Sequence, residues 1–146
     1  MKKSAIIIDL DGTLADISHR RHHVEDGNKN WKAFYNGITR DDINVWCHAI
    51  IDRFSDDNEV LLVTGRPEPY RDITRAWLDR YHISYSGLFM RPDKDYRKDF
   101  VIKQEIYDNY IKDSFDILFA IDDRQQVVDM WRRNDITCLQ CAEGDL

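Results

Sequence analysis

Two aspartates, two residues apart, follow a short apolar run near the N-terminus. The run spans Ala5–Ile8, and the string Asp-Leu-Asp-Gly-Thr-Leu follows it at residues 9–14. Such a run is typical of a buried strand, in which alternate side chains share a face, so Asp9 and Asp11 start on the same side. Neighbouring carboxylates repel each other and suit Mg²⁺, which combines carboxylate ligands with substrate phosphate. The alternative is a strand with an ordinary Asp-Gly turn, and the full string favours the metal site.

A second predicted strand also ends in residues that could bind phosphate. Val60–Val63 are four consecutive apolar residues, which is typical of a strand buried on both faces of a parallel sheet. Thr64 and Gly65 follow, and a hydroxyl group with free backbone N–H groups at a strand end can bind phosphate oxygens. Arg66 adds a cation. A strand-to-helix turn is the alternative, and the position after a second apolar strand favours phosphate binding.

A third predicted strand, Phe115–Arg124, carries Asp122 and Asp123 near its end. Two adjacent carboxylates after a buried strand are costly unless a cation lies nearby. Predicted helices alternate with the predicted strands, which favours a mostly parallel sheet with helices on both faces. Ligands in such folds bind at the carboxyl ends of the strands. We therefore expect the three strand ends to converge on one crevice.

The string at residues 9–14 resembles the first motif of the haloacid-dehalogenase-like phosphohydrolases, and the other two strand ends resemble further motifs of that family. The resemblance implies a three-layer α/β/α, Rossmann-like fold with a mostly parallel central sheet and little or no cap domain. It implies that Asp9 is the nucleophile that takes the phosphoryl group and that Asp11 is the general acid and base. It also implies Mg²⁺ as cofactor, held by Asp9, Asp122 and the backbone carbonyl of Asp11.

The same resemblance assigns residues around the phosphate. Thr64, the N–H of Gly65 and Lys103 would bind its oxygens, with Lys103 offsetting the charge of the nucleophile. Asp123 would orient the ligands of the metal. Helical periodicity alone is equally compatible with a solvent-exposed Lys103.

A closer resemblance links the chain to the 3′-phosphatase domain of phage-type polynucleotide kinase–phosphatases. It rests on the string Asp-Asp-Arg-Gln-Gln-Val-Val-Asp-Met-Trp-Arg-Arg at residues 122–133, on Arg-Lys-Asp with Ile-Lys at residues 97–103, and on the terminal Gly-Asp-Leu. Arg20, Arg66 and Asp99 fall on matching positions and are predicted to bind the substrate or support the site. The implied activity is removal of a 3′-phosphate from a DNA or RNA end, or from a nucleoside 3′-monophosphate. The chain has no Gly-x-x-x-x-Gly-Lys-Ser/Thr string, so we expect no kinase half in it.

Two other functions remain open at this stage. A nucleotidase or another small-molecule phosphatase would share every catalytic residue. A binding module without activity would be expected to lack Asp9 or Asp11, and both are present. The resemblance is weakest over residues 21–58, the segment expected to choose the substrate.

That weakly matched segment contains basic and aromatic residues. His19, His22 and His23 follow no recognised zinc spacing, so a metal site there is not expected. Arg20 and Arg21 are candidates for contacts with phosphate or backbone, and solvent exposure is the preferred prediction for Arg21. A short helix over residues 30–36 places Trp31, Phe34 and Tyr35 on one face. Core packing is the favoured role of these rings, and stacking on a base at the substrate entrance is the alternative.

The remaining pattern predicts further elements. A helix over Thr39–Phe54 would be capped by Thr39 with Asp42. Other helices are expected over residues 68–82, 98–110 and 125–133, with strands over residues 87–91 and 136–139, and residues 142–146 are expected to trail out.

Composition limits the class of protein. The length of 146 residues, without a repeat or linker, predicts a single domain over residues 1–146. A net charge of −6 argues against gripping long nucleic acid through many phosphates, and it permits the handling of a single strand end. Three cysteines predict no disulfide framework, and Cys138 and Cys141 are expected to act as small apolar residues. With no long apolar run or signal peptide, we expect a cytoplasmic protein without a membrane span.

Overall fold

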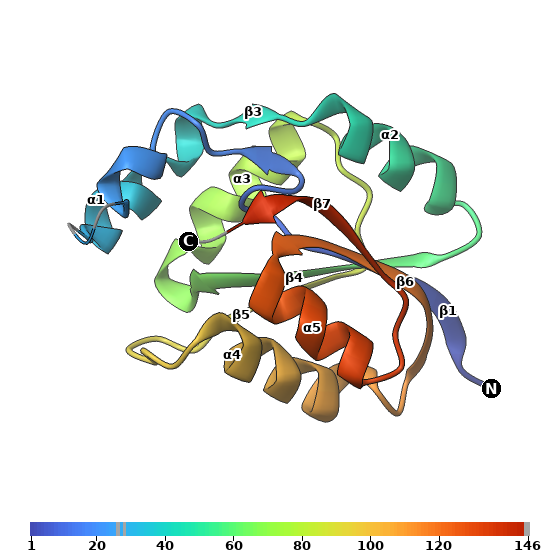
Figure 1. Cartoon of the computed structure of the whole chain (residues 1–146). Coiled ribbons are helices and arrows are strands. Elements are labelled where there is room, and N and C mark those ends of the chain that lie inside the picture. Colours follow the sequence, from blue (N-terminus) through green and yellow to red (C-terminus); the bar gives the residue numbers. More distant parts are fainter. Residues whose placement is uncertain (26, 28, 145–146) are drawn as a thin grey trace.

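A parallel five-stranded sheet forms the centre of the molecule (Figure 1). The computed structural model describes residues 1–25, 27 and 29–144. The strand order is β5-β4-β1-β6-β7, and every neighbouring pair is parallel. The strands are β1 (Lys3–Ile8), β4 (Glu59–Pro67), β5 (Gly87–Arg91), β6 (Phe115–Arg124) and β7 (Cys138–Gly144).

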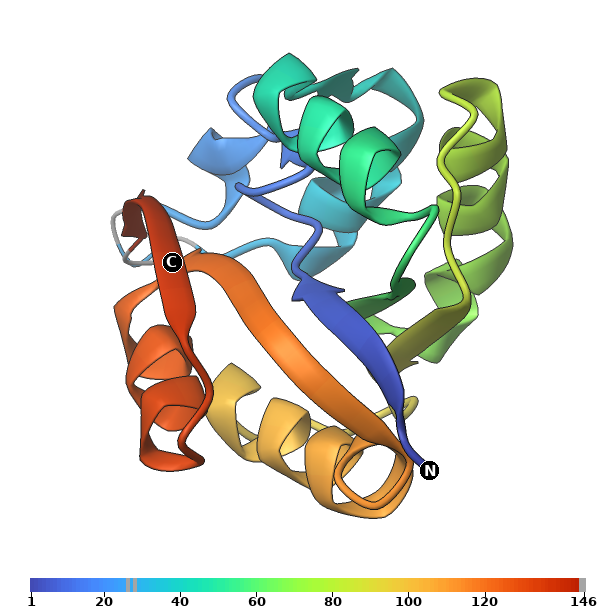
Figure 2. The same cartoon turned by 90° about the vertical axis from the view of Figure 1, so that its right-hand side faces the viewer.

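Helices cover both faces of this sheet, as Figure 2 shows. On one face lie α2 (Val45–Phe54) and α3 (Arg71–Arg80), and on the other lie α4 (Asp99–Ile106) and α5 (Gln125–Arg133). The predicted three-layer α/β/α fold with a mostly parallel sheet is confirmed.

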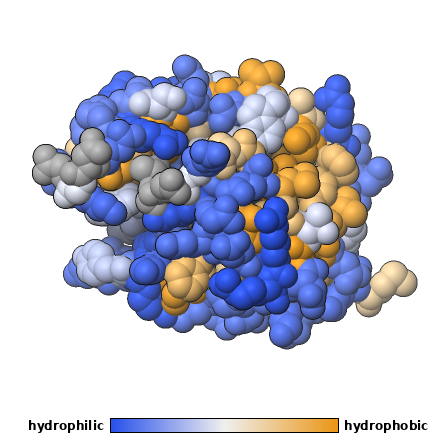
Figure 3. Space-filling model, viewed as in Figure 1, coloured by the Kyte–Doolittle hydropathy of each residue, from blue (hydrophilic) through white to orange (hydrophobic). Residues whose placement is uncertain are grey.

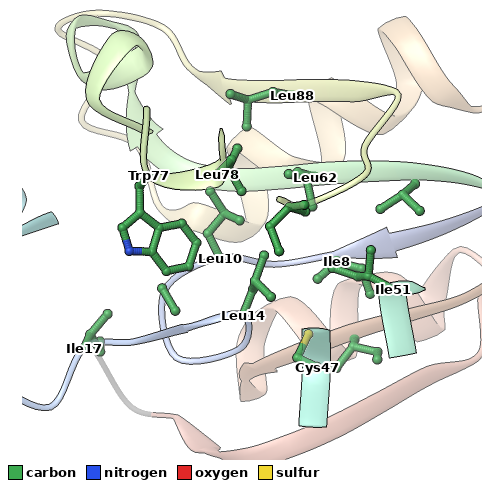
Figure 4. Packing of buried hydrophobic residues seen from close by; sticks show 14 of the residues in the cluster. Ile8, Leu10, Leu14, Ile17, Cys47, Ile51, Leu62, Trp77, Leu78 and Leu88 are labelled. Atoms are coloured by element: carbon green, nitrogen blue, oxygen red, sulfur yellow. The ribbon is translucent and has the colours of Figure 1, made fainter. Parts of the chain in front are cut away.

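Successive side chains of β1 point to opposite faces of the sheet and pack in the two halves of the hydrophobic core. Ile6 and Ile8 pack in the cluster that contains Cys47, Ile51, Trp77 and Leu78 of α2 and α3, part of which is drawn in Figure 4. Ala5 and Ile7 point to the other face and pack with residues of α4 and α5. Because β1 is apolar on both faces, it occupies the middle of the sheet.

A small excursion of the chain lies between β1 and α2. It contains α1 (Trp31–Asn36) and a two-stranded antiparallel ribbon of β2 (Ala15–Asp16) and β3 (Asp42–Ile43). Figure 1 shows α1 at the end of the molecule where the strands of the sheet have their carboxyl ends. This excursion, rather than a separate cap domain, borders that end of the sheet.

The predicted helix over Thr39–Phe54 is wrong in its first part. Residues Ile38–Arg40 form a 3-10 turn, Asp42 pairs with Asp16 in the ribbon, and the helix begins only at Val45. Tertiary pairing with β2 overrides the helical pattern here. Asn44 occupies the N-cap position and donates its side-chain amide to the carbonyl of Thr13, which ties α2 to the turn after β1.

Other boundaries differ from the predictions by a turn or a few residues. The last strand extends to Gly144, so residues 142–144 do not trail out, and Asp145 and Leu146 lie outside the described residues. The helix predicted over residues 98–110 is α4 followed by a π-helical segment, Tyr107–Ile111. The helix predicted over residues 68–82 is a 3-10 turn at Glu68–Tyr70 followed by α3. Within the described part of the chain, no helix has both the length and the apolar character needed to cross a membrane.

Candidate active site

The three predicted strand ends meet because their strands are neighbours. Ile8, the last residue of β1, pairs with Leu62 of β4 on one side and with Ile121 of β6 on the other. Asp9 follows directly and donates its backbone N–H to the carbonyl of Ile121, 3.1 Å away. Register therefore brings the ends of β1, β4 and β6 to one edge of the sheet, as predicted for a parallel fold.

Lys103 of α4 lies between two of the acids. Its ammonium group donates to Asp9 Oδ1 at 2.9 Å and to Asp122 Oδ2 at 2.8 Å. The side chain is only 2% exposed, which excludes the solvent-exposed alternative. Burial alone would lower the pKa of Lys103, but Asp122 and Asp9 outweigh it and hold the pKa above its ordinary value. The lysine is therefore a fixed positive charge at the floor of the site.

Three carboxylates gather around this lysine. One oxygen from each of Asp9, Asp122 and Asp123 lies within 4.8 Å of the others. Burial and the charge of Asp122 raise the pKa of Asp9 well above its ordinary value, and they raise the pKa of Asp123 to about 6. Three acids around one lysine leave an excess of negative charge, which a divalent cation would offset.

A hydroxyl group fixes the remaining oxygen of Asp9. Thr13 Oγ1 donates to Asp9 Oδ2 at 2.9 Å, inside the buried turn after β1. Cys141 lies 3.6 Å from the same hydroxyl group. Thr13 is part of the first string, but its spacing from Asp9 did not suggest this contact. Both oxygens of Asp9 are thus oriented, one by Lys103 and the other by Thr13.

Asp11 contacts two arginines, whereas Asp9, Asp122 and Asp123 form the acid cluster. Arg20 and Arg66 each place an Nη2 atom 2.6 Å from Asp11 Oδ1. Burial favours the neutral acid, but Arg66 and Arg20 outweigh it and hold the pKa of Asp11 well below its ordinary value. The resemblance predicts that the backbone carbonyl of Asp11 binds the metal, and this stays a prediction. Its side chain belongs to a separate ion-pair network.

Asp41 completes that network, and the sequence did not single it out. It is fully buried and accepts from Arg20 Nε and Nη2, both at 2.7 Å, while its Oδ1 also lies 2.7 Å from His19 Nε2. Arg66 Nη2 reaches Asp41 Oδ2 at 3.5 Å. The neighbouring Asp42 is exposed, and nothing in the string Thr-Arg-Asp-Asp distinguishes the two acids.

Arg20 and Arg66 were predicted to bind substrate or support the site, and the structure places them behind Asp11. They are 1% and 0% exposed and are not among the residues that line the pocket. Their contacts therefore position Asp11. Arg21 forms a long, 3.9 Å ion pair with Glu25 at the surface, as its predicted exposure suggests. Among the described residues, the three histidines near position 20 belong to no metal-binding cluster.

Asp99 packs against the turn at the end of β4 that is predicted to bind phosphate. It pairs with Arg91 at 2.5 Å and with Arg124 at 2.8 Å. Despite its burial, Lys103, Arg124 and Arg91 lower its pKa. Gly65 packs against it so closely that a Cβ atom there would lie 2.3 Å from Asp99 Oδ1. Thr64 is buried, and its hydroxyl oxygen accepts the N–H of Arg66 at 3.1 Å, which leaves its own O–H to donate.

A substitution of Gly12 would test the turn that follows Asp11. The φ of Gly12 is +84°, and a Cβ atom would lie 2.3 Å from Asp123 Oδ2. We expect Gly12→Ala to cost about 1–2 kcal/mol of backbone strain and to displace Asp123. Gly27 is a matched control, because its φ is +74° and no described atom lies within 4 Å of its added Cβ.

For both glycine variants, we would measure the release of phosphate from a phosphate ester, which is the activity that the family resemblance implies, together with the thermal midpoint. Gly12→Ala should lose at least tenfold in kcat, whereas Gly27→Ala should show only the loss of stability. Equal activity of the two variants would mean that the placement of Asp123 by this turn does not affect catalysis.

A pocket of about 640 Å³ opens above these residues. One wall carries Trp31, Tyr35 and Tyr70, and the other consists of Arg91 and the loop of residues 93–98. Figure 3 shows this face of the molecule, hollowed at its left side between α1 and that loop, with a mostly hydrophilic rim. The volume is within the range of sites for whole small molecules and is far larger than a phosphate group needs.

Within the described residues, none of the three cysteines belongs to a group that could hold a metal ion. Cys47, Cys138 and Cys141 are free, and burial raises the pKa of Cys138 to about 12. The prediction that Cys138 and Cys141 serve as small apolar residues fits Cys138, which is buried, whereas Cys141 is half-buried and lies beside the hydroxyl group of Thr13.

Comparison with known proteins agrees with this geometry. The sequence model of the family described as "Polynucleotide kinase PNKP phosphatase domain" matches residues 3–146. A chain from the solved "Pnkp1/Rnl/Hen1 RNA repair complex" superposes with a TM-score of 0.84 over 99% of this chain, at 35% identity. A class C acid phosphatase from Bacillus anthracis, at 19% identity over 84% of this chain and 53% of its own, has a TM-score of 0.65 and so shares the fold.

A curated relative points the same way. The "Putative bifunctional polynucleotide kinase/RNA ligase" of Autographa californica nuclear polyhedrosis virus is 29% identical over 131 residues, 88% of this chain. This chain spans 18% of that viral protein and 44% of the chain from the repair complex. With the family model covering nearly all of its residues, the chain belongs to the family of polynucleotide kinase phosphatase domains, and it is a phosphatase of the haloacid-dehalogenase-like fold.

Proposed function

We propose that residues 1–146 form one phosphatase domain that removes 3′-phosphates from DNA or RNA ends, or from nucleoside 3′-monophosphates, by way of an aspartyl-phosphate on Asp9. The observation that carries the proposal is the different surroundings of the two aspartates. Asp9 lies in the acid cluster with Lys103, whereas Asp11 is bound by two arginines. Such a separation suits a nucleophile and a proton-transferring group.

The residues of the acid cluster fit Mg²⁺. Asp9 and Asp122 would hold it together with the backbone carbonyl of Asp11, and Asp123 would orient these ligands. When bound, Mg²⁺ supplies the positive charge that neutralises the phosphate oxygens. The fit rests on three buried carboxylates that lie together, two of which contact Lys103, because oxygen-preferring divalent cations relieve such a charge imbalance.

In the first step, a carboxylate oxygen of Asp9 attacks phosphorus, and the bond between phosphorus and the leaving oxygen breaks. Asp11 gives that oxygen a proton, so the alcohol leaves neutral. Both arginine contacts fall on Oδ1 of Asp11, and in the described part of the chain no arginine contacts Oδ2. Oδ2 is therefore the oxygen suited to carry the proton, which the negative charge of an entering phosphate favours.

In the second step, water attacks the phosphorus of the aspartyl-phosphate, and Asp9 is released as a carboxylate. Asp11, now ionised, takes the proton from that water. The two arginines favour this ionised form of Asp11. The hydroxyl of Thr64, the N–H of Gly65 and the ammonium of Lys103 bind the phosphate oxygens as charge moves onto them.

The pocket supports a nucleic-acid end as the substrate. Lys29, Lys32, Lys94 and Lys98 line it, and in the described residues none of these lysines lies within ion-pair distance of a carboxylate. Free lysines beside the phosphate site would attract the backbone of a strand, although the whole chain is acidic. The matching family model and the viral relative, both described as polynucleotide kinases, also support a nucleic-acid end as the substrate.

The test measures phosphate release from three substrates, each with Mg²⁺ and with EDTA. These are a 3′-phosphorylated hexanucleotide, a nucleoside 3′-monophosphate and a nucleoside 5′-monophosphate. We expect release from both 3′-phosphates in Mg²⁺ only. Turnover of the 5′-monophosphate with no release from the hexanucleotide would instead identify a nucleotidase.

The acid cluster also predicts how pH changes the effect of Mg²⁺ on stability. In the unfolded chain, aspartates lose their protons near pH 3.8. In the folded state without metal, the pKa values of Asp9 and Asp123 are raised, so these two acids keep their protons to higher pH. The contribution of Asp123 to stability is complete below about pH 4 and is lost as pH rises through about 6, and the contribution of Asp9 changes in the same direction. Since Mg²⁺ binds the ionised carboxylates, protons compete with it in that window.

We therefore expect Mg²⁺ to raise the thermal midpoint more at about pH 7 than at about pH 5. Thermal unfolding in EDTA and in Mg²⁺ at both pH values measures the rise in thermal midpoint that Mg²⁺ causes at each pH. Comparing the two rises cancels the pH effects of groups far from the metal site. Equal rises, or a larger one at about pH 5, would contradict binding of the metal at this cluster.

A further inference from the structure

Three aromatic rings form a continuous ladder along one wall of the pocket. Trp31 and Tyr35, one turn apart on α1, stack with ring centroids 5.9 Å apart and an angle of 24° between their planes. Tyr70, just before α3, continues the ladder with its centroid 5.0 Å from that of Tyr35. All three side chains line the same pocket as Asp9 and Asp11.

Trp31 is not part of the core, unlike its neighbour Phe34. Phe34 is 2% exposed and packs in the cluster on the α2 and α3 face, whereas the exposed fraction of Trp31 is 39%. Phe34 meets the Trp31 ring edge-on at 5.6 Å and so holds it in place. The predicted core role thus fits Phe34, and Trp31 presents a large, supported ring to the pocket.

The inner end of the ladder lies close to the reacting groups. Burial raises the pKa of the Tyr35 hydroxyl, and the charges of Asp11 and Asp99 raise it further. Tyr35 lines the same pocket as Asp11, the residue proposed to give a proton to the leaving oxygen. A leaving group that departs toward Asp11 would have its sugar and base beside Tyr35, with Trp31 further out.

The charge around the outer end suits a nucleic-acid strand. Lys29 places its ammonium group 5.8 Å from the centroid of the Trp31 ring, and Lys32 lines the pocket one residue beyond Trp31. Proteins that bind single strands combine stacking rings with such cations along the backbone path. A small phosphate ester that lacks a base would use neither feature.

We propose that Trp31, Tyr35 and Tyr70 stack on a nucleobase of one of the last two nucleotides and thereby select nucleic-acid ends over phosphate esters that lack a base. This inference rests on the proposed function and names the part of the substrate that the site recognises beyond the phosphate. Trp31 is a specificity-determining residue in this account, since it lies away from the acid cluster.

The experiment is a double-mutant cycle in which one change is made in the protein and the other in the substrate. Wild type and Trp31→Ala are each assayed on a 3′-phosphorylated hexanucleotide and on two versions of it that lack the base at the last or the next-to-last position. In wild type, loss of the stacked base should lower kcat/KM about tenfold or more, mainly through KM. In Trp31→Ala, the full hexanucleotide should lose a similar factor, and removing the base should then have little further effect.

Two control variants keep the result specific. Trp46→Ala removes a tryptophan of similar exposure, 43%, on α2 outside the pocket, and should keep the full preference for the base. Trp31→Phe keeps a stacking ring and should restore most of the preference lost in Trp31→Ala. Thermal unfolding of each variant identifies any that fail to fold, and in that case Trp31→Leu replaces Trp31→Ala.

The inference is overturned if the wild-type enzyme hydrolyses the full and the base-lacking hexanucleotides equally well. It is also overturned if Trp31→Ala keeps the wild-type preference for the base. Failure of the proposed function looks different, because no 3′-phosphorylated hexanucleotide, with or without its bases, would then release phosphate.

Discussion

Asp9→Asn is expected to lower kcat by roughly a thousandfold or more and to leave the fold intact. An amide does not attack phosphorus, so the covalent step is lost. The fold should persist because Asp9 is a buried acid beside Asp122, and its replacement by a neutral group removes repulsion. Lys103 keeps its 2.8 Å contact with Asp122.

Phosphate release and thermal unfolding measure this prediction together. Asp57→Asn, an exposed acid in the turn before β4, is the control and should match wild type in both. A folded Asp9→Asn protein whose kcat is within tenfold of wild type would contradict the role of Asp9 as the nucleophile.

The second large effect, a loss of stability and activity, is expected on replacing Asp41, which takes part in no chemical step of the proposed mechanism. Asp41→Ala would leave the guanidinium of Arg20 buried with only Asp11 as acidic partner, and Arg66 would lose its 3.5 Å contact. Breaking a buried charge network by removing one partner typically costs about 3–5 kcal/mol. Activity should fall as well, because both arginines that position Asp11 are held by Asp41.

Denaturant unfolding measures this loss, and Asp42→Ala is the matched control. Asp42 is the next residue and is exposed, so its replacement should change the free energy of unfolding by less than about 0.5 kcal/mol. If Asp41→Ala does not fold, Asp41→Asn keeps one acceptor oxygen and should show a smaller loss. A change below about 1 kcal/mol in Asp41→Ala would mean that the network contributes little.

The sheet and the convergence of its strand ends could be predicted from the sequence because they depend on local patterns. Val60–Val63 is apolar at four consecutive positions, and only a strand buried on both faces uses such a run fully. Once β1, β4 and β6 are neighbours in a parallel sheet, Asp9, Thr64 and Asp122 must share an edge. The family resemblance then supplied Lys103, whose burial no periodicity could indicate.

The ion-pair network around Asp11 could not be predicted, because it depends on contacts between segments that are distant in sequence. Asp41 lies 21 residues from Arg20 and 25 from Arg66, in a stretch whose pattern favours a helix. The ribbon pairing of Asp42 with Asp16 prevents that helix and buries the preceding acid. Local propensity gave no signal for a pairing that only the folded chain creates.

We propose that this phosphatase acts on the 3′ end of a nucleic acid, and a single substrate with two phosphates can test that proposal. A hexanucleotide that carries a phosphate at both its 3′ and 5′ ends is incubated with the protein and Mg²⁺, and the product is identified by mass spectrometry of its fragments. We expect loss of the 3′-phosphate alone, with the 5′-phosphate retained. Loss of the 5′-phosphate, or retention of both while small phosphate esters are hydrolysed, would contradict it.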